Sequence, residues 1–188
     1  MNKKISAFIL AGGQSKRFGQ DKSLYEFEGK PLIKHVFDTI KPVFSDIYII
    51  ANDFEKFSFL ESKIYPDLIP KLGPTGGIYS ALYNLKKERA FIFACDTPFV
   101  KKELIEYMIS INTDKEIIVP FLGGFLEPLH AIYSEKCLES MKNFIEKKGR
   151  KITAYINERE IREVTEAEIE YYEDPFKIFR NINRKSDL

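Results

Sequence analysis

The stretch LAGGQSKRFGQDK at residues 10–22 follows an apolar run, Ile5–Leu10, and decides the fold of this chain. The apolar run is typical of a buried strand, and the chain then turns on Gly12 and Gly13. Glycine lets backbone N–H groups approach an anion closely, and the cations that follow can neutralise its charge. A strand that leads into such a turn indicates a binding site for a nucleoside triphosphate.

Two familiar phosphate-binding patterns do not describe this stretch. Lys22-Ser23 lacks the upstream glycine spacing of GxxxxGK[ST], and the glycines do not follow GxGxxG. A glycine turn whose cations face solvent is the alternative interpretation. The complete spacing of the two glycines, Arg17 and Lys22 after a strand favours the functional interpretation.

Length and composition limit the class of protein. The chain has 188 residues, of which 44% are hydrophobic, so we expect one domain, residues 1–188, with a substantial core. A formal net charge of +1 gives no reason to expect binding to nucleic acid or to membranes. Cys95 and Cys137 form no disulfide framework, and the first apolar run is too short for a signal peptide or a membrane span. We therefore expect a cytoplasmic protein.

Short apolar runs alternate with helical patterns in the first two thirds of the chain. The predicted strands are Ile5–Leu10, Asp46–Ala51, Lys63–Tyr65, Ala90–Ala94 and Glu116–Pro120. The predicted helices are Pro31–Ile40, Thr75–Leu85 and Lys101–Ile111. Strands that alternate with helices form βαβ units. This pattern predicts an α/β fold, a single Rossmann-like domain with a mostly parallel sheet and helices on both faces.

The pattern changes after Pro120. There, Gly123-Gly124 predicts a hairpin turn, and Phe125–Tyr133 predicts a further strand. The remaining predictions are a helix at about Glu135–Lys148, a short helix near Arg150, a strand at Ile161–Thr165, a polar helix at Glu166–Tyr172, and a last short strand or loop at Phe179–Ile182.

A carboxylate, Asp96, follows the predicted strand Ala90–Ala94. In open α/β sheets, ligands bind outside the carboxyl ends of the strands. Mg²⁺ prefers oxygen ligands and usually takes one or two protein carboxylates together with phosphate oxygens. Asp96 therefore suits a magnesium ligand. The alternative is that Asp96 or Thr97 caps the helix that begins near Lys101.

A second glycine pair, Gly76-Gly77, lies at the start of the predicted helix Thr75–Leu85. A helix N-terminus attracts anions, and glycine opens its backbone to close approach. Gly76 is therefore a candidate for nucleotide binding. Asp67 and Asn52 each follow a predicted strand, but both residue types are also common in turns.

The pattern LAGGxSxRxGxDK resembles the nucleotidyltransferases, in particular the molybdenum cofactor guanylyltransferases. Later segments resemble that family in the same order: Asp67 with GPTGGI at residues 73–78, CDTPF at 95–99, EPLHA at 127–131 and RNIN at 180–183. The resemblance implies the fold of the nucleotide-diphospho-sugar transferases. It also implies transfer of GMP from GTP to Mo-molybdopterin, with release of pyrophosphate and with Mg²⁺ as cofactor.

The resemblance also implies roles for particular residues. We expect Lys22 to neutralise charge near the α-phosphate, Arg17 to neutralise the leaving pyrophosphate, and Asp96 to hold Mg²⁺. The implied nucleotide-binding residues are Leu10, Ala11, Gly12, Gly13, Lys22, Asn52, Asp67, Gly76 and Asp96. The implied acceptor-binding residues are His130, Asn181 and Asn183, although His130 is equally well interpreted as a buried structural histidine.

Rival functions share the same kind of loop. A molybdopterin cytidylyltransferase, a terpenoid-precursor cytidylyltransferase and a sugar-phosphate nucleotidyltransferase remain open, as does a non-catalytic GTP-binding regulator. The regulator is disfavoured by Arg17, Lys22 and Asp96 together, because a pure binder needs no complete charge-neutralising set. The partners implied by the resemblance are GTP, Mo-molybdopterin, other proteins of molybdenum cofactor biosynthesis and molybdoenzyme chaperones.

Overall fold

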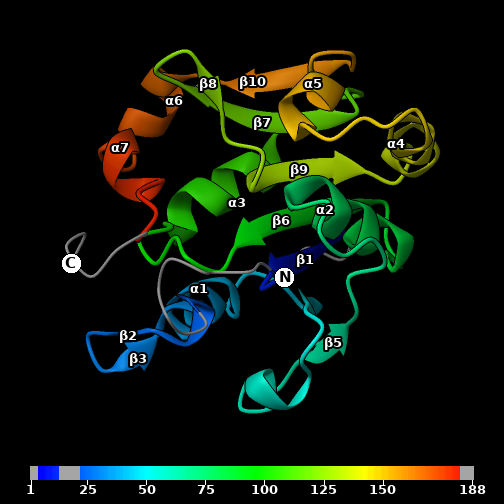
Figure 1. Cartoon of the computed structure of the whole chain (residues 1–188). Coiled ribbons are helices and arrows are strands. Elements are labelled where there is room, and N and C mark those ends of the chain that lie inside the picture. Colours follow the sequence, from blue (N-terminus) through cyan, green and yellow to red (C-terminus); the bar gives the residue numbers. More distant parts are fainter. Residues whose placement is uncertain (1–3, 13–21, 183–188) are drawn as a thin grey trace.

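A mainly parallel sheet forms the centre of the molecule (Figure 1). The structure is a computed structural model that describes residues 4–12 and 22–182. Across these residues the central sheet has the order β10-β7-β9-β6-β1-β4-β5, β8 pairs with β7, and β2-β3 forms a separate hairpin. The strands are β1 (Ile5–Leu10), β2 (Glu26–Phe27), β3 (Lys30–Pro31), β4 (Ile47–Ile50), β5 (Lys63–Tyr65), β6 (Arg89–Ala94), β7 (Ile117–Leu122), β8 (Phe125–Leu126), β9 (His130–Ser134) and β10 (Ile161–Val164).

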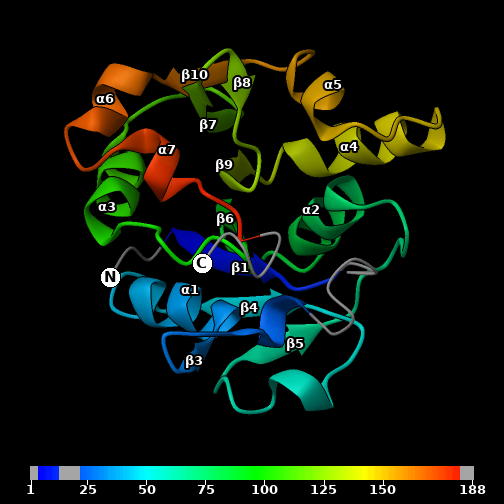
Figure 2. The same cartoon turned by 60° about the vertical axis from the view of Figure 1, so that its left-hand side comes forward.

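Helices cover both faces of this sheet (Figure 2). They are α1 (Leu32–Ile40), α2 (Pro74–Tyr83), α3 (Lys102–Ser110), α4 (Cys137–Glu146), α5 (Ile152–Ile156), α6 (Glu166–Glu170) and α7 (Pro175–Ile178). Apolar residues of α1, α3, α6 and α7 pack into the core on one face. Those of α2, α4 and α5 pack into the core on the other face.

Strand β1 shows why the sequence folds in this way. Its six residues are all buried, with Ala7 and Ile9 facing one core and Phe8 and Leu10 facing the other. A strand that is covered on both faces is apolar at nearly every position, and Ser6 is the one polar residue of β1. This is why the run before the glycine turn could be recognised as a strand.

The predicted α/β class, with a mostly parallel sheet, is confirmed. Strands β1 and β5 have the predicted bounds, and the other elements before Pro120 differ by one or two residues at their ends. The predicted turn at Gly123-Gly124 is present, with φ of 56° and 86° at the two glycines. These left-handed values explain why glycine occupies both positions of a tight hairpin turn.

The predicted continuous strand Phe125–Tyr133 is wrong. The chain instead forms β8, a turn, and then β9, because the N–H of His130 donates to the carbonyl of Glu127 at 3.1 Å. Strand β9 then runs antiparallel to both of its neighbours, β6 and β7. A reversal of this kind depends on contacts with other strands, which the local pattern does not reveal.

The C-terminal part differs from the prediction in one helix. Phe179–Ile182 returns to the sheet as a loop, which is one of the two forms predicted for it. The short helix α7 was not predicted, although Asp174 caps it by accepting the N–H of Phe176 at 2.9 Å. The β2-β3 hairpin was also missed.

The carboxyl ends of β1, β4, β5 and β6 lie along one edge of the sheet, because these four strands are parallel. The chain leaves these ends through Gly12, Asn52, Asp67 and Asp96. The fold therefore places four of the predicted site residues in loops at a single edge. Across the described ranges, no helix is both long and apolar enough to cross a membrane.

Candidate active site

A cavity of about 510 Å³ lies at the carboxyl ends of β1, β4 and β5. Ala11, Gly12, Asn52 and Asp67 all line it, so the fold brings together four residues that were predicted to bind nucleotide. A cleft of this size at the ends of parallel strands is a typical site for a small molecule.

Asn52 and Asp67 hold each other in place at this cavity. The side-chain carbonyl of Asn52 accepts the backbone N–H of Asp67 at 3.0 Å. One carboxylate oxygen of Asp67, Oδ1, accepts the N–H of Ile69 at 3.0 Å and lies 3.2 Å from the hydroxyl of Ser80. The other oxygen, Oδ2, has no hydrogen bond to the described residues. It is therefore available to accept a donor from a ligand.

The N-terminus of α2 borders the same cavity. Gly73, which is the N-cap of α2 and has φ of 65°, lines the cavity and offers no side chain to cap the helix. The free N–H groups of a first helical turn attract anions. Lys71, another lining residue, adds a cation. Sequence reasoning missed both residues, although a glycine before Pro74 was a usable signal for the helix start.

Gly76 and Gly77 have a packing role in this structure. A Cβ on Gly76 would lie 2.7 Å from the carbonyl oxygen of Ile69, and one on Gly77 would lie 2.9 Å from a methyl group of Leu10. Their α-carbons thus face protein atoms, not the cavity. Leu10 itself is buried at the end of β1. Gly76 contributes to the site by letting the loop that carries Asp67 pack closely against α2.

Lys22 and Asp96 form an ion pair at the same edge of the sheet as this cavity, between the Nζ of Lys22 and the Oδ2 of Asp96. The two side chains are only 13% and 20% exposed. Lys22 begins a short 3₁₀ helix that follows the glycine loop, whereas Asp96 follows β6. Two predicted catalytic residues are therefore in direct contact, and partial burial strengthens their attraction.

The C-terminal segment reaches the same place. The backbone N–H of Ile182 donates to the carbonyl of Asp96 at 3.1 Å. The preceding residue, Asn181, is exposed and so is free to meet a ligand near Asp96. Gly13, Arg17 and Asn183 lie outside the described residues.

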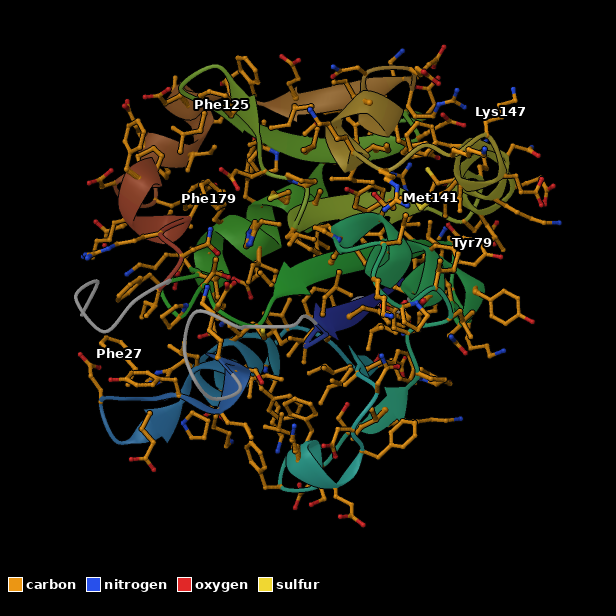
Figure 3. All side chains as sticks on the ribbon, in the orientation of Figure 1. Phe27, Tyr79, Phe125, Met141, Lys147 and Phe179 are labelled. Atoms are coloured by element: carbon orange, nitrogen blue, oxygen red, sulfur yellow. The ribbon has the colours of Figure 1, made fainter. Side chains whose placement is uncertain are left out.

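His130 is the predicted site residue that the fold buries. Its side chain is 3% exposed and lies among the rings of Phe91, Phe93 and Phe179, each about 5 Å away between ring centroids. Figure 3 labels Phe179, where the chain leaves α7. Neither ring nitrogen has a partner among the described residues, and burial lowers the pKa of His130 to about 3. In this structure His130 is a neutral core residue with no surface for an acceptor.

The described residues fit a magnesium ion whose ligands come mainly from the phosphate oxygens of a bound nucleotide. No group of three or more His, Cys, Asp or Glu side chains that could hold a metal occurs in residues 4–12 and 22–182. Mg²⁺ often takes one or two carboxylates and fills its other positions with water and phosphate oxygens. Asp96, partly exposed at the strand end, fits that demand.

The fold and the site, taken with the comparisons that follow, place this chain among the nucleotidyltransferases. The family model for the MobA-like NTP transferase domain matches residues 7–164, and the chain belongs to this family. A probable molybdenum cofactor guanylyltransferase from Natranaerobius thermophilus is 38% identical, with 100% of this chain and 95% of that protein covered. The molybdenum cofactor guanylyltransferase of Desulfosudis oleivorans is 34% identical, over 98% of this chain and 92% of that protein.

A solved structure supports the same assignment. The crystal structure of molybdopterin-guanine dinucleotide biosynthesis protein A from Archaeoglobus fulgidus matches with a TM-score of 0.82 and 25% identity. The match covers 97% of this chain and 94% of that chain. The resemblance that the motifs indicated, and the fold that it implied, are therefore confirmed.

Proposed function

We propose that this chain transfers GMP from GTP to Mo-molybdopterin and releases pyrophosphate. The observation that carries the proposal is the contact between Lys22 and Asp96 at the sheet edge that also carries a nucleotide-sized cavity. The names of the full-length relatives supply the substrates. The chain has only two cysteines, Cys95 and Cys137, and so small a number agrees with a reducing, cytoplasmic setting.

The reaction does not require a strong general base. A phosphate monoester is largely dianionic near neutral pH, because its second pKa is about 6. An oxygen of the acceptor's terminal phosphate would form a bond to the α-phosphorus of GTP. The bond from that phosphorus to the β-phosphate oxygen would break, and pyrophosphate would leave with the electron pair. The enzyme's task is to bring two anions together, by positioning and by charge neutralisation.

The residues divide this task between them. Lys22 neutralises charge near the α-phosphate, and Arg17, outside the described residues, is proposed to neutralise the pyrophosphate. Backbone N–H groups after β1 and at the start of α2 bind phosphate oxygens, while Asp67 accepts hydrogen bonds from the ribose or from the guanine edge. Mg²⁺, held by Asp96, would supply further positive charge to the phosphate oxygens.

Nucleotide selectivity tests the proposal against its nearest rivals. Purified enzyme with Mg²⁺ is titrated with GTP, CTP, ATP and UTP, and pyrophosphate release is then measured with Mo-molybdopterin. Tightest binding of GTP, together with pyrophosphate release only when acceptor is present, is the expected result. Preferred use of CTP would indicate a cytidylyltransferase. GTP binding without any turnover would indicate a regulator.

A further inference from the structure

Glu127 lies at the same edge of the sheet as Asp96, on the side away from the nucleotide cavity. Its N–H donates to the carbonyl of Pro120 at the end of β7, at 2.9 Å. The carbonyl of Leu129, two residues later, accepts the N–H of Ala94 at 3.0 Å, just before Asp96. Strand β9 lies beside β6, opposite β1, so the reacting centre separates Glu127 from the cavity.

The carboxylate of Glu127 has no partner within the described part of the chain. It forms no hydrogen bond or ion pair there, although its side chain is largely withdrawn from water. Burial raises the pKa of Glu127 to about 6, and no cation among the described residues opposes that rise. A carboxylate held in this way costs folding free energy, since desolvation is not compensated. Carboxylates of this kind are common where a ligand supplies the missing donors.

Two exposed aromatic side chains lie at this end of the sheet. Phe125 is 74% exposed, and Figure 3 shows it on the β7-β8 hairpin, two residues before Glu127. Phe176 of α7 is 62% exposed and borders the turn of that hairpin, where its ring would lie 3.7 Å from a Cβ on Gly123. A flat heterocycle is the ligand that suits exposed aromatic rings.

We infer that Glu127 binds the amino-amide edge of the acceptor's pterin ring. That edge presents two parallel donors, the ring N3–H and the 2-amino group, which match the two oxygens of one carboxylate. The inference rests on the proposed function for the identity of the acceptor. It assigns Glu127 to acceptor specificity, with no part in the bond-making step.

Pterin binding by the whole protein tests this directly. The chain contains no tryptophan, so pterin fluorescence can be followed without tryptophan emission. The ligands compared are pterin and lumazine, which carries a carbonyl in place of the 2-amino group. Wild-type protein should prefer pterin, and Glu127→Gln should lose roughly 10- to 100-fold in pterin affinity while lumazine binding stays weak. Equal pterin affinity in the two proteins would overturn the inference.

Turnover separates this inference from the proposed function. In Glu127→Gln the KM for Mo-molybdopterin should rise while the KM for GTP stays unchanged. A rise only in the KM for GTP would overturn the assignment of Glu127 to the acceptor. If wild-type protein failed to form the dinucleotide yet still preferred pterin in the binding assay, the proposed function would fail and the Glu127 contact would stand.

Thermal stability distinguishes a ligand-binding role from a structural one. Because the carboxylate is unpaired and partly buried, Glu127→Gln should melt at the same temperature as wild type, or higher, at pH 8. A structural residue would instead lower the melting temperature when replaced. Glu163→Gln, on an exposed position of β10, is the matched control and should change neither pterin affinity nor KM.

Discussion

The ammonium group of Lys22 is paired with the carboxylate of Asp96, 74 positions away in the chain. The first residue follows the loop after β1, and the second follows the neighbouring strand β6. Parallel pairing of these strands brings the two groups to one edge. The Asp96 carboxylate, which we expect to hold Mg²⁺, therefore already has the Lys22 ammonium group beside it.

Replacing Lys22 by Met should slow pyrophosphate release by about 10²- to 10³-fold, because a positioned cation near the reacting phosphate is lost. The fold should persist, because the Lys22–Asp96 pair lies at the edge of the sheet and belongs to neither hydrophobic core. Circular dichroism and thermal melting check the fold. Lys34→Met is the control, because Lys34 pairs with Asp38 on α1 and should leave the rate unchanged. A near-normal rate in Lys22→Met would remove this lysine from the mechanism.

Replacing Asp96 by Asn should raise the Mg²⁺ concentration required for half-maximal rate and lower the maximal rate. A neutral amide oxygen is a weaker ligand for a hard dication than a carboxylate oxygen. The measurement is a magnesium titration of initial rates at saturating GTP. Asp114→Asn, in the loop between α3 and β7, serves as the control. An unchanged magnesium dependence would rule against Asp96 as the ligand.

Two glycine substitutions should have opposite effects. In Gly76→Ala the new Cβ would meet the Ile69 carbonyl oxygen at 2.7 Å, so the free energy of unfolding should fall by about 1–3 kcal/mol. In Gly12→Ala the Cβ has no atom of the described residues within 4 Å, so stability should hold while GTP affinity falls. Urea unfolding and GTP titration of both variants check this. The packing role of Gly76 fails if the first variant is as stable as wild type.

His130 should make the protein sensitive to acid. Burial lowers its pKa to about 3 from a value of 6.5, so only the unfolded chain gains a proton between these pH values. The free energy of unfolding should therefore fall as pH drops below 6.5, by about 2 kcal/mol at pH 5. In His130→Leu this loss should disappear, and the KM for Mo-molybdopterin should not change. Urea unfolding at pH 5 and pH 7.5 provides the measurement, and parallel pH profiles would contradict the assignment.

Local sequence features were sufficient for much of the fold. The apolar runs of β1 and β6 are recognisable because a strand covered on both faces carries few polar residues, here only Ser6 and Arg89. The hairpin at Gly123-Gly124 is recognisable because two left-handed residues in a row require glycine or its equivalents. The antiparallel direction of strand β9 could not be predicted from the local sequence, because its partner strands β6 and β7 are distant in the chain.

The candidate site was likewise predictable only in part from the sequence. The sequence placed Asp67 and Asp96 after predicted strands and Lys22 after the glycine turn, and the resemblance to a known family implied their roles. It could not tell which groups touch. The Lys22–Asp96 pair and the Asn52–Asp67 hydrogen bond depend on the order of the strands in the sheet.

What the sequence determined by itself is the kind of chemistry: a glycine turn after a buried strand, with cations and carboxylates suited to a nucleoside triphosphate. Only the tertiary structure decided which residues line the cavity and which pack the protein. His130 and Gly76 lie in the interior, and Glu127 lies at the sheet edge without a partner among the described residues. The physical reason is that burial and pairing are properties of contacts between distant segments, which no local pattern of residues contains.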